Sequence, residues 1–161
     1  MSSPVTTDQN SRPRFEPGRA LLLAGLAGTF ADTDTAGIPD LWQTFLPQIH
    51  RITNRISNVA YGVIFPARSP DSMEYFCGVE AASLIGLPET FTSRMLPARK
   101  YIVFTLMTGS ESLAEEIGRV WRERLPELGL TAAQAPFFEL YPADFHPETN
   151  PSGIEIWIPL N

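Results

Sequence analysis

The stretch "LWQTFLPQI", residues 41–49, has a near copy later in the chain, "VWRERLPEL", residues 120–128. Both follow the pattern apolar–Trp–x–x–x–Leu–Pro–x–apolar, and the step from Trp42 to Trp121 is 79 residues, as is the step from Pro47 to Pro126. Apolar residues recur at helical spacing through both stretches, so each predicts an amphipathic helix, and Pro47 is expected to end or kink the first one. The two predicted helices raise the question of whether the segments around them repeat as well.

Strand patterns surround both predicted helices in the same order. Alternating or continuous runs of β-branched and aromatic residues predict strands at 21–30, 59–65, 75–80, 100–108, 137–141 and 154–158, a short strand at 90–96, and helices starting near 38 and spanning 110–128. The order is β-α-β-β, a short link, then β-α-β-β. Pro17 and Pro97 are 80 residues apart, and residues 75–80 fall on 154–159 at an offset of 79. Three elements in register indicate a duplication, and the alternative is convergent use of Trp and Pro near helix ends.

The predicted fold is therefore α+β, with tandem βαββ modules related by a pseudo-twofold duplication, antiparallel sheets and a central ligand cleft. We expect a disordered tail at residues 1–12 and a single domain at 13–161, with one module at about 13–82 and the other at about 95–161. Each helix covers one sheet face, and the junction of two such modules is a favoured place for a ligand.

Composition excludes several classes of function. The net charge is −6, with 18 acidic and 12 basic residues, which argues against direct binding to nucleic acid. The single cysteine, Cys77, allows no intrachain disulfide, and His50 and His146 lie in different elements, so neither a metal nor another cofactor is expected. No stretch approaches the roughly 20 apolar residues of a membrane span, and we expect a cytoplasmic protein with no membrane partner.

One strand, "FFELY" at 137–141, carries an acid among rings. Alternation places Phe137, Glu139 and Tyr141 on one face and the other two residues on the opposite, core face. Aromatic rings attract a cation and a carboxylate supplies its counter-charge, while a desolvated glutamate can also act as a general acid or base. Alternation alone leaves open whether Glu139 lines a pocket or is simply solvated.

Seven stretches in serial order resemble the gyrase-inhibitor-like (GyrI-like) superfamily, the effector-binding domain of some AraC- and MerR-class regulators. They are "IPDLWQTFLPQI", "AYGVIF", "EYFCGVE", "LPARKYIVFTLMTG", "EEIGRVWRERLPELGL", "FFELY" and "GIEIWIPL", spanning roughly residues 15–160. The resemblance implies a tandem βαββ (SHS2-like) pair with a central cleft. It also implies that Glu139 matches the pocket glutamate that pairs with lipophilic cations in the multidrug-sensing members.

The same resemblance implies further ligand-binding residues. The expected lining rings are Tyr61, Phe104, Trp121, Tyr141 and Trp157, and Glu155 is a candidate second acid. Each has an ordinary alternative: Trp121 lies in the apolar stripe of its helix, Glu155 suits a solvated edge strand, and the tyrosines suit cross-strand packing. No catalytic residue can be assigned.

We therefore expect a stand-alone effector-binding domain, because no helix-turn-helix segment precedes residue 15. Its function would be to bind small hydrophobic, cationic molecules in the cleft, and it could form a homodimer. The family leaves two alternatives: a hydrolase of electrophilic, cyclopropane-type toxins that uses Glu139, or a protein-binding inhibitor similar to those of DNA gyrase.

Overall fold

The computed structural model describes residues 12–31, 36–66, 71–106, 113–145 and 153–161. Its strands are β1 (Arg14–Gly18), β2 (Leu21–Ala31), β3 (Arg55–Phe65), β4 (Ser72–Ala81), β5 (Thr92–Leu96), β6 (Arg99–Thr105), β7 (Phe137–Tyr141) and β8 (Glu155–Pro159). Its helical segments are α2 (Ile38–Phe45), the 3₁₀ helix η1 (Leu46–Arg51), α3 (Leu113–Arg119), the π-helical turn η2 (Val120–Arg124) and α4 (Leu125–Glu127).

The predicted strands and helices are present, and one strand was not predicted. The missed strand is β1, whose Pro17 and Gly18 are residues that weaken a strand and are tolerated at a sheet edge. The predicted strand at 90–96 begins at Thr92. The predicted helix start at Ser110 and the last two residues of the strand ending at 108 lie outside the described residues.

The eight strands form one antiparallel sheet in the order β1-β6-β8-β7-β3-β4-β2-β5. The order reads the same from both ends when β1 is matched with β5, β2 with β6, β3 with β7 and β4 with β8. This symmetry confirms the α+β fold with a pseudo-twofold pair of modules. It also shows an exchange that was not predicted, because β1 and β5 each pair with the module to which they do not belong.

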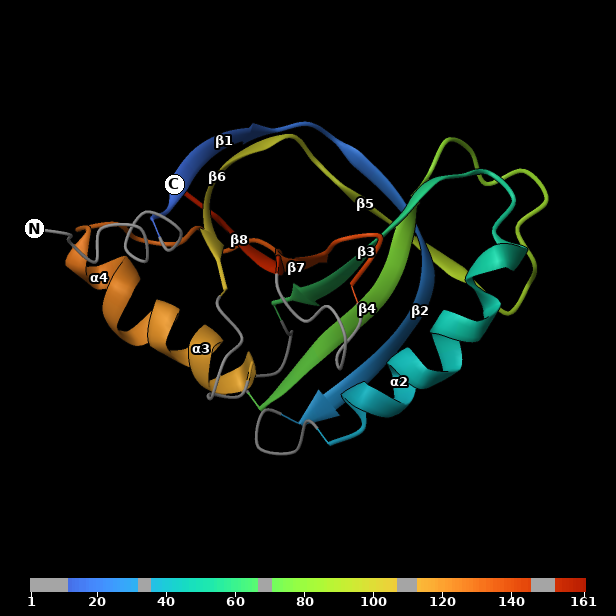
Figure 1. Cartoon of the computed structure of the whole chain (residues 1–161), viewed down its shortest axis with the longest axis horizontal. Helices are drawn as coiled ribbons and strands as arrows, with labels where there is room; N and C mark the ends of the chain where they lie inside the picture. Colours follow the sequence, from blue (N-terminus) through green and yellow to red (C-terminus); the bar gives the residue numbers. More distant parts are fainter. Residues whose placement is uncertain (1–11, 32–35, 67–70, 107–112, 146–152) are drawn as a thin grey trace, which may run out of the picture.

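The two ends of the curled sheet are joined by one ladder. β1 continues into β2 across Arg19 and Ala20, and β5 continues into β6 across Pro97 and Ala98. The register is unbroken across both links, since Gly18 pairs with Arg99 and Leu21 pairs with Leu96. In Figure 1 this ladder forms the arch at the top, where β1 and β6 curve over β8 and β7. The sheet is therefore a curled half-barrel with a distinct interior face.

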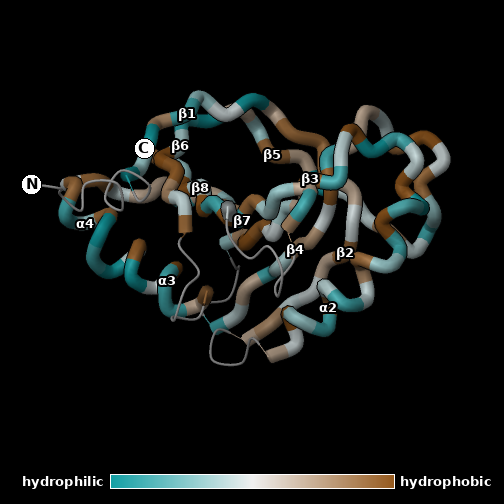
Figure 2. The backbone as a smooth tube through the Cα atoms, in the orientation of Figure 1, coloured by the Kyte–Doolittle hydropathy of each residue, from teal (hydrophilic) through white to brown (hydrophobic). Residues whose placement is uncertain are grey.

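Both helices lie against the outer face of the sheet, below it in Figure 1. The interior face holds one apolar core, made by Leu21, Leu23, Tyr61, Val63, Phe76, Leu96, Tyr101, Val103 and Phe138. The outer face holds two others. The α2-side core includes Phe45, Tyr75, Cys77 and Val79, and the α3-side core includes Phe104, Val120, Leu125, Ile154, Ile156 and Ile158. Figure 2 shows the amphipathic pattern of α3, which alternates between hydrophilic and hydrophobic residues.

A proline changes the helix geometry at the same place in both modules. Pro47 lies in η1, directly after α2, and Pro126 follows η2, where the backbone N–H of Leu125 donates to the carbonyl of Val120. A proline cannot donate the hydrogen bond that an α-helix requires, so the preceding turn changes its geometry. The prediction that Pro47 ends or kinks its helix is confirmed. No helix in the described ranges is long and apolar enough to cross a membrane.

Candidate functional site

Glu139 lies at the centre of the sheet on its outer face. It is in β7, between Gly62 of β3 and Ile156 of β8. Its neighbours Phe137 and Tyr141 pack with the α3-side core, while Phe138 and Leu140 pack with the interior core, as alternation predicted. The side chain is only 9% exposed, so this acid is not simply solvated.

Two tyrosines donate hydrogen bonds to the same carboxylate oxygen. Tyr75 Oη lies 2.8 Å and Tyr141 Oη 3.0 Å from Glu139 Oε1. Trp42 Nε1 donates in turn to Tyr75 Oη at 2.9 Å, and the rings of Trp42 and Tyr141 meet edge to face with centroids 5.1 Å apart. We call Trp42, Gly62, Tyr75, Glu139 and Tyr141 the Glu139 cluster. It connects helix α2 with strands β3, β4 and β7 where the two outer cores meet.

Burial dominates the electrostatics of this cluster. Removal from water raises the pKa of Glu139, and the hydrogen bonds from Tyr75 and Tyr141 lower it in part, because they stabilise the carboxylate. The same burial and the nearby carboxylate raise the pKa of Tyr75 well above its usual value. None of the ion pairs within the described residues involves Glu139. When Glu139 is ionised, its charge is stabilised by two hydroxyl groups and by no cation among these residues.

Gly62 is the counterpart of Glu139 in the other module. Gly62 pairs with Cys77 on β4, Glu139 pairs with Ile156 on β8, and Cys77 and Ile156 are related by the repeat offset of 79. A sequence offset of 79 alone would match Glu139 with Ala60, which lies two residues before Gly62 on the same face of β3. The constant offset therefore misplaces the counterpart of Glu139 by two residues. Because Gly62 and Glu139 also pair directly with each other, the pseudo-twofold axis passes between them.

The structure separates the other predicted site residues into two groups. Tyr141 contacts Glu139, and Trp121 packs edge to face on Phe137 on the same sheet face, with ring centroids 4.9 Å apart. Phe104 is fully buried in the α3-side core, under the guanidinium of Arg124. Tyr61, Glu155 and Trp157 lie on the interior face of the sheet. The sheet stands between these three residues and Glu139, and their role in ligand binding stays a prediction.

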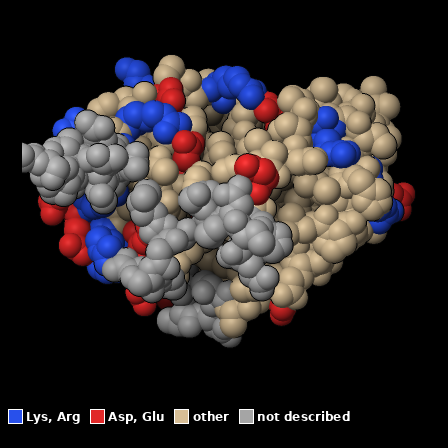
Figure 3. Space-filling model, in the orientation of Figure 1, with Lys and Arg blue, Asp and Glu red and all other residues tan. Residues whose placement is uncertain are grey.

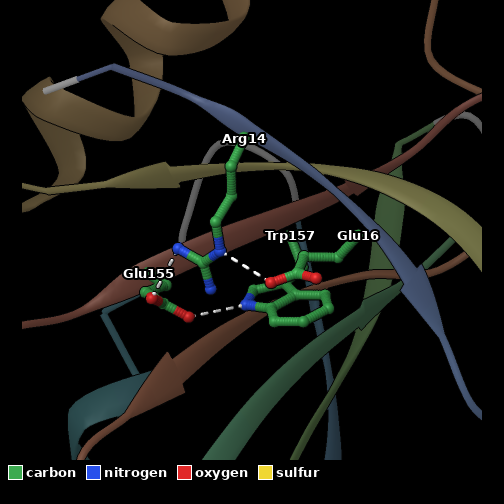
Figure 4. A network of polar contacts seen from close by, with 4 residues as sticks. All are labelled: Arg14, Glu16, Glu155 and Trp157. Carbon is green, nitrogen blue, oxygen red and sulfur yellow. Dashed lines mark hydrogen bonds and ion pairs between the residues drawn. The ribbon is translucent and has the colours of Figure 1, made fainter.

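Glu155 and Trp157 belong to a separate polar cluster on the interior face, which Figure 4 shows with Arg14 and Glu16. Glu155 accepts a hydrogen bond from Trp157 Nε1 at 3.0 Å and pairs with Arg14 Nη1 at 2.9 Å. Arg14 Nε reaches Glu16 at 2.7 Å, and the guanidinium carbon lies 5.8 Å from the centroid of the Trp157 ring. We call these four residues the Glu155 cluster. Its acids and its ring already hold a cation from strand β1.

The interior face shows the same arrangement in the other module. Arg94, 80 residues after Arg14, pairs with Glu74 at 3.0 Å and lies over the rings of Phe65 and Phe76. Glu80, which is also buried, is held by Arg19. The glutamates that project from β1, β4 and β8 onto this face therefore all pair with arginine.

Figure 3 shows charged side chains gathered over the half that carries α3, α4 and β6, while the surface over α2 and β2 is largely uncharged.

One hollow of the described surface lies away from Glu139. It is lined by Phe15, Glu16, Pro17, Lys100, Tyr101 and Leu160, where β1 pairs with β6. Phe15 is 66% exposed there, so the hollow is open to water. It includes no member of the Glu139 cluster, and the central cleft expected from the sequence stays a prediction.

Sequence reasoning missed Tyr75, Trp42 and Gly62. Alternation within β4 puts Tyr75 on the face opposite Phe76, but no local pattern says that this face adjoins Glu139, two strands along the sheet order. A signal for Trp42 was present, because its repeat partner Trp121 was a predicted lining residue. Gly62 carries no side chain that a search for chemistry would select.

Comparisons with known proteins bear on the family and the fold of this chain. The model of the GyrI-like small molecule binding domain matches residues 12–161. The transcriptional regulator BrlR of Pseudomonas aeruginosa is 31% identical over 133 residues, which are 81% of this chain and 48% of that protein. The chain thus spans about half the length of this relative.

Two solved structures share the fold at low identity. SAV2435 bound to tetraphenylphosphonium superposes with a TM-score of 0.73 and 20% identity, covering 93% of this chain and 94% of that one. A hydrolase from Listeria innocua superposes with a TM-score of 0.57 and 9% identity, covering 98% and 97%. One structure contains a bound hydrophobic cation and the other is described as an enzyme, so the fold by itself does not decide between binding and catalysis.

Proposed function

The chain belongs to the family of GyrI-like small molecule binding domains, and we propose that its ligands are hydrophobic organic cations whose charge is balanced by Glu139. The ligand would lie where the α2-side and α3-side cores meet, against the rings of the Glu139 cluster. The family gives a small-molecule ligand. The cationic character and the place of binding are the proposed parts.

One observation carries the proposal: among the described ion pairs, the interior-face glutamates all have an arginine partner and Glu139 has none. A buried carboxylate without a cation carries a desolvation cost that an incoming cation would offset. Tyr75 and Tyr141 both donate to Oε1, so they stabilise the ionised form without neutralising it. This leaves the acid ready to act as a counter-charge.

The rings around Glu139 favour a hydrophobic organic cation over a metal ion or a small ammonium ion. Trp42 and Tyr141 meet edge to face beside the carboxylate, and Phe137 and Trp121 extend the same surface towards α3. Aromatic faces attract organic cations and also bury apolar area. The tetraphenylphosphonium bound by SAV2435, a protein of the same fold, has this combination of charge and aromatic groups.

A second candidate function is hydrolysis, since burial raises the pKa of Glu139 and a carboxyl group with a raised pKa is better suited to act as a general acid. The donor chain from Trp42 through Tyr75 to Glu139 would then orient the acid. Slow turnover of an electrophilic ligand would add to the binding function and would use the same residue.

The proposal is tested by calorimetric titration at pH 8 with tetraphenylphosphonium and with its neutral analogue triphenylphosphine oxide. We expect saturable binding of the cation, much weaker binding of the neutral compound, and loss of this preference in Glu139→Gln. Glu155→Gln is the matched control, because it removes an acid from the opposite face of the same sheet. Equal binding of the cation by wild type and Glu139→Gln would refute the proposal.

A further inference from the structure

Tyr75 reaches Glu139 across a strand that lies between them. Tyr75 is on β4 and Glu139 is on β7, and β3 separates these strands in the sheet. The residue of β3 that pairs with Glu139 is Gly62. A Cβ atom at Gly62 would lie 2.7 Å from Glu139 Oε1 and closer still to Tyr75 Oη. Any side chain here would occupy the path of the hydrogen bond.

The backbone does not explain this glycine. The described glycines with positive φ are Gly86, Gly129 and Gly153, so Gly62 adopts a conformation that other residues can take. A glycine inside a strand costs stability because it gives up side-chain packing and loses more entropy on folding. Space for the Tyr75–Glu139 contact is the feature that accounts for its presence.

We propose that Gly62 is a positioning residue of the cation site, whose missing side chain forms the notch through which Tyr75 reaches Glu139. The proposal deepens the proposed function, since the positioned carboxylate is the one that would receive the ligand. It also explains the broken symmetry of the domain. On the pseudo-twofold axis one module supplies the acid and the other supplies the empty space, so a second acid at this position has no room.

The notch controls the charge of the acid through Tyr75. The hydrogen bond from Tyr75 favours the ionised carboxylate, and Trp42 in α2 holds the Tyr75 hydroxyl in place. The other groups that face Glu139 are Tyr141 on its own strand and Ile156 on β8, while Cys77 lies in the same row on β4 with its pKa raised to about 12 by burial. These groups stay neutral through the range in which a carboxyl titrates. The loss of the Tyr75 bond would therefore appear as an upward shift in the titration of Glu139.

The test follows the ¹³C NMR signal of the Glu139 carboxyl group through a pH titration without ligand, with the signal assigned by its absence in Glu139→Gln. In Gly62→Ala and in Tyr75→Phe we expect the midpoint to move upward by about one pH unit, the effect of losing one hydrogen bond to an ionised acceptor. In the double variant we expect no further shift, because both changes remove the same contact. Ala60→Gly, two residues away on the same face, should leave the midpoint unchanged.

An unchanged midpoint in folded Gly62→Ala, or additive shifts in the double variant, would overturn the proposal. If Gly62→Ala fails to fold, the double variant decides, because removal of the Tyr75 hydroxyl takes away the atom nearest to the new methyl group and leaves only the end of the Glu139 side chain and the ring at position 75 to shift slightly. Recovery of the folded protein in that variant supports the notch, and continued failure refutes it. Since no ligand is present, the result is independent of whether the protein binds cations. A cation titration at pH 7 then shows whether the shifted acid weakens affinity severalfold and whether the loss disappears at higher pH.

Discussion

The Glu139 cluster and the Glu155 cluster lie on opposite faces of the same sheet and are built from similar parts. Each contains a glutamate that accepts a hydrogen bond from an aromatic side chain, and each has a tryptophan close by. They differ in one component: Arg14 supplies a cation to Glu155, whereas no described residue supplies one to Glu139. The presence of acids and rings is therefore a poor guide to a ligand site. The uncompensated charge is the more selective feature.

The topology of the sheet explains this difference. Arg14 comes from β1, the exchanged edge strand, which is separated from β8 by β6, and its side chain lies on the interior face. Glu139 lies in a central strand on the outer face, among the apolar residues that the helices cover. An edge strand can bring a half-exposed arginine over an inner acid at little desolvation cost. A central position on the covered face offers no such neighbour.

The largest expected effect comes from replacing Glu139, the acid that has no cation partner among the described residues. Glu139→Gln should weaken tetraphenylphosphonium binding by roughly 2–5 kcal/mol, the usual range when one member of a desolvated charge pair is lost. Glu155→Gln should change the affinity by less than about twofold, because its carboxylate lies beyond the sheet from the proposed ligand. Titration of both variants gives the comparison directly. Similar losses in the two would mean that the clusters do not differ in function.

The second prediction concerns pH. Burial raises the pKa of Glu139, so its carboxylate is lost as the pH falls through that raised value. Cation affinity should therefore be constant above the pKa and decline by about tenfold for each pH unit below it. The dissociation constant measured between pH 4 and pH 9 gives this profile. A flat profile in the wild type would remove Glu139 as the counter-charge.

The third prediction is that Glu139 lowers the stability of the folded protein at neutral pH. Because the folded-state pKa of Glu139 is raised, its contribution to stability is present below the unfolded-state pKa and is lost as the pH rises through the folded-state value. At pH 7, the free energy of unfolding of Glu139→Gln should be about 0.5–2 kcal/mol higher than that of the wild type. The gain should disappear near pH 3, where both side chains are neutral. Denaturant unfolding at the two pH values measures it, and a loss of stability at pH 7 would contradict the account.

The smallest effect is expected from a change in the Glu155 cluster, whose acids already pair with Arg14. Arg14→Met keeps the apolar stem and removes the ion pairs with Glu16 and Glu155 and the contact with the Trp157 ring. Since the arginine side chain is 44% exposed, we expect a loss of about 1 kcal/mol of stability that shrinks in high salt. Cation binding to the outer face should be unaffected. Thermal unfolding at low and high salt tests the first part, and a loss larger than that of a typical core truncation would assign β1 a greater structural role.

The fold was accessible from the sequence because the repeat is carried by residues with strong local effects. Trp42 with Pro47 and Trp121 with Pro126 mark equivalent places in two helices, and alternation identified the two faces of the strand at 137–141. Strand β1 was missed because Pro17 and Gly18 give no strand signal of their own. The exchange of β1 and β5 was missed because it depends on pairing between distant strands.

The site was predictable only within one strand. The periodicity of "FFELY" placed Glu139 and Tyr141 together, but it does not say which face of a neighbouring strand adjoins them. Periodicity therefore could not show that Tyr61, Glu155 and Trp157 lie on the face opposite Glu139, and it gave no reason to include Tyr75. Register and curvature settle these faces, and both arise from long-range pairing that a local pattern does not contain.

The most direct test of the central claim is the number of protons released when the cation binds. Calorimetric titration with tetraphenylphosphonium near pH 5, in two buffers of different ionisation enthalpy, measures this number. If Glu139 is the counter-charge, binding should draw the carboxyl group into its ionised form and release protons from wild type and from Glu155→Gln, but none from Glu139→Gln. Binding that releases no protons at any pH between 4 and 8, or equal release from Glu139→Gln, would contradict the account.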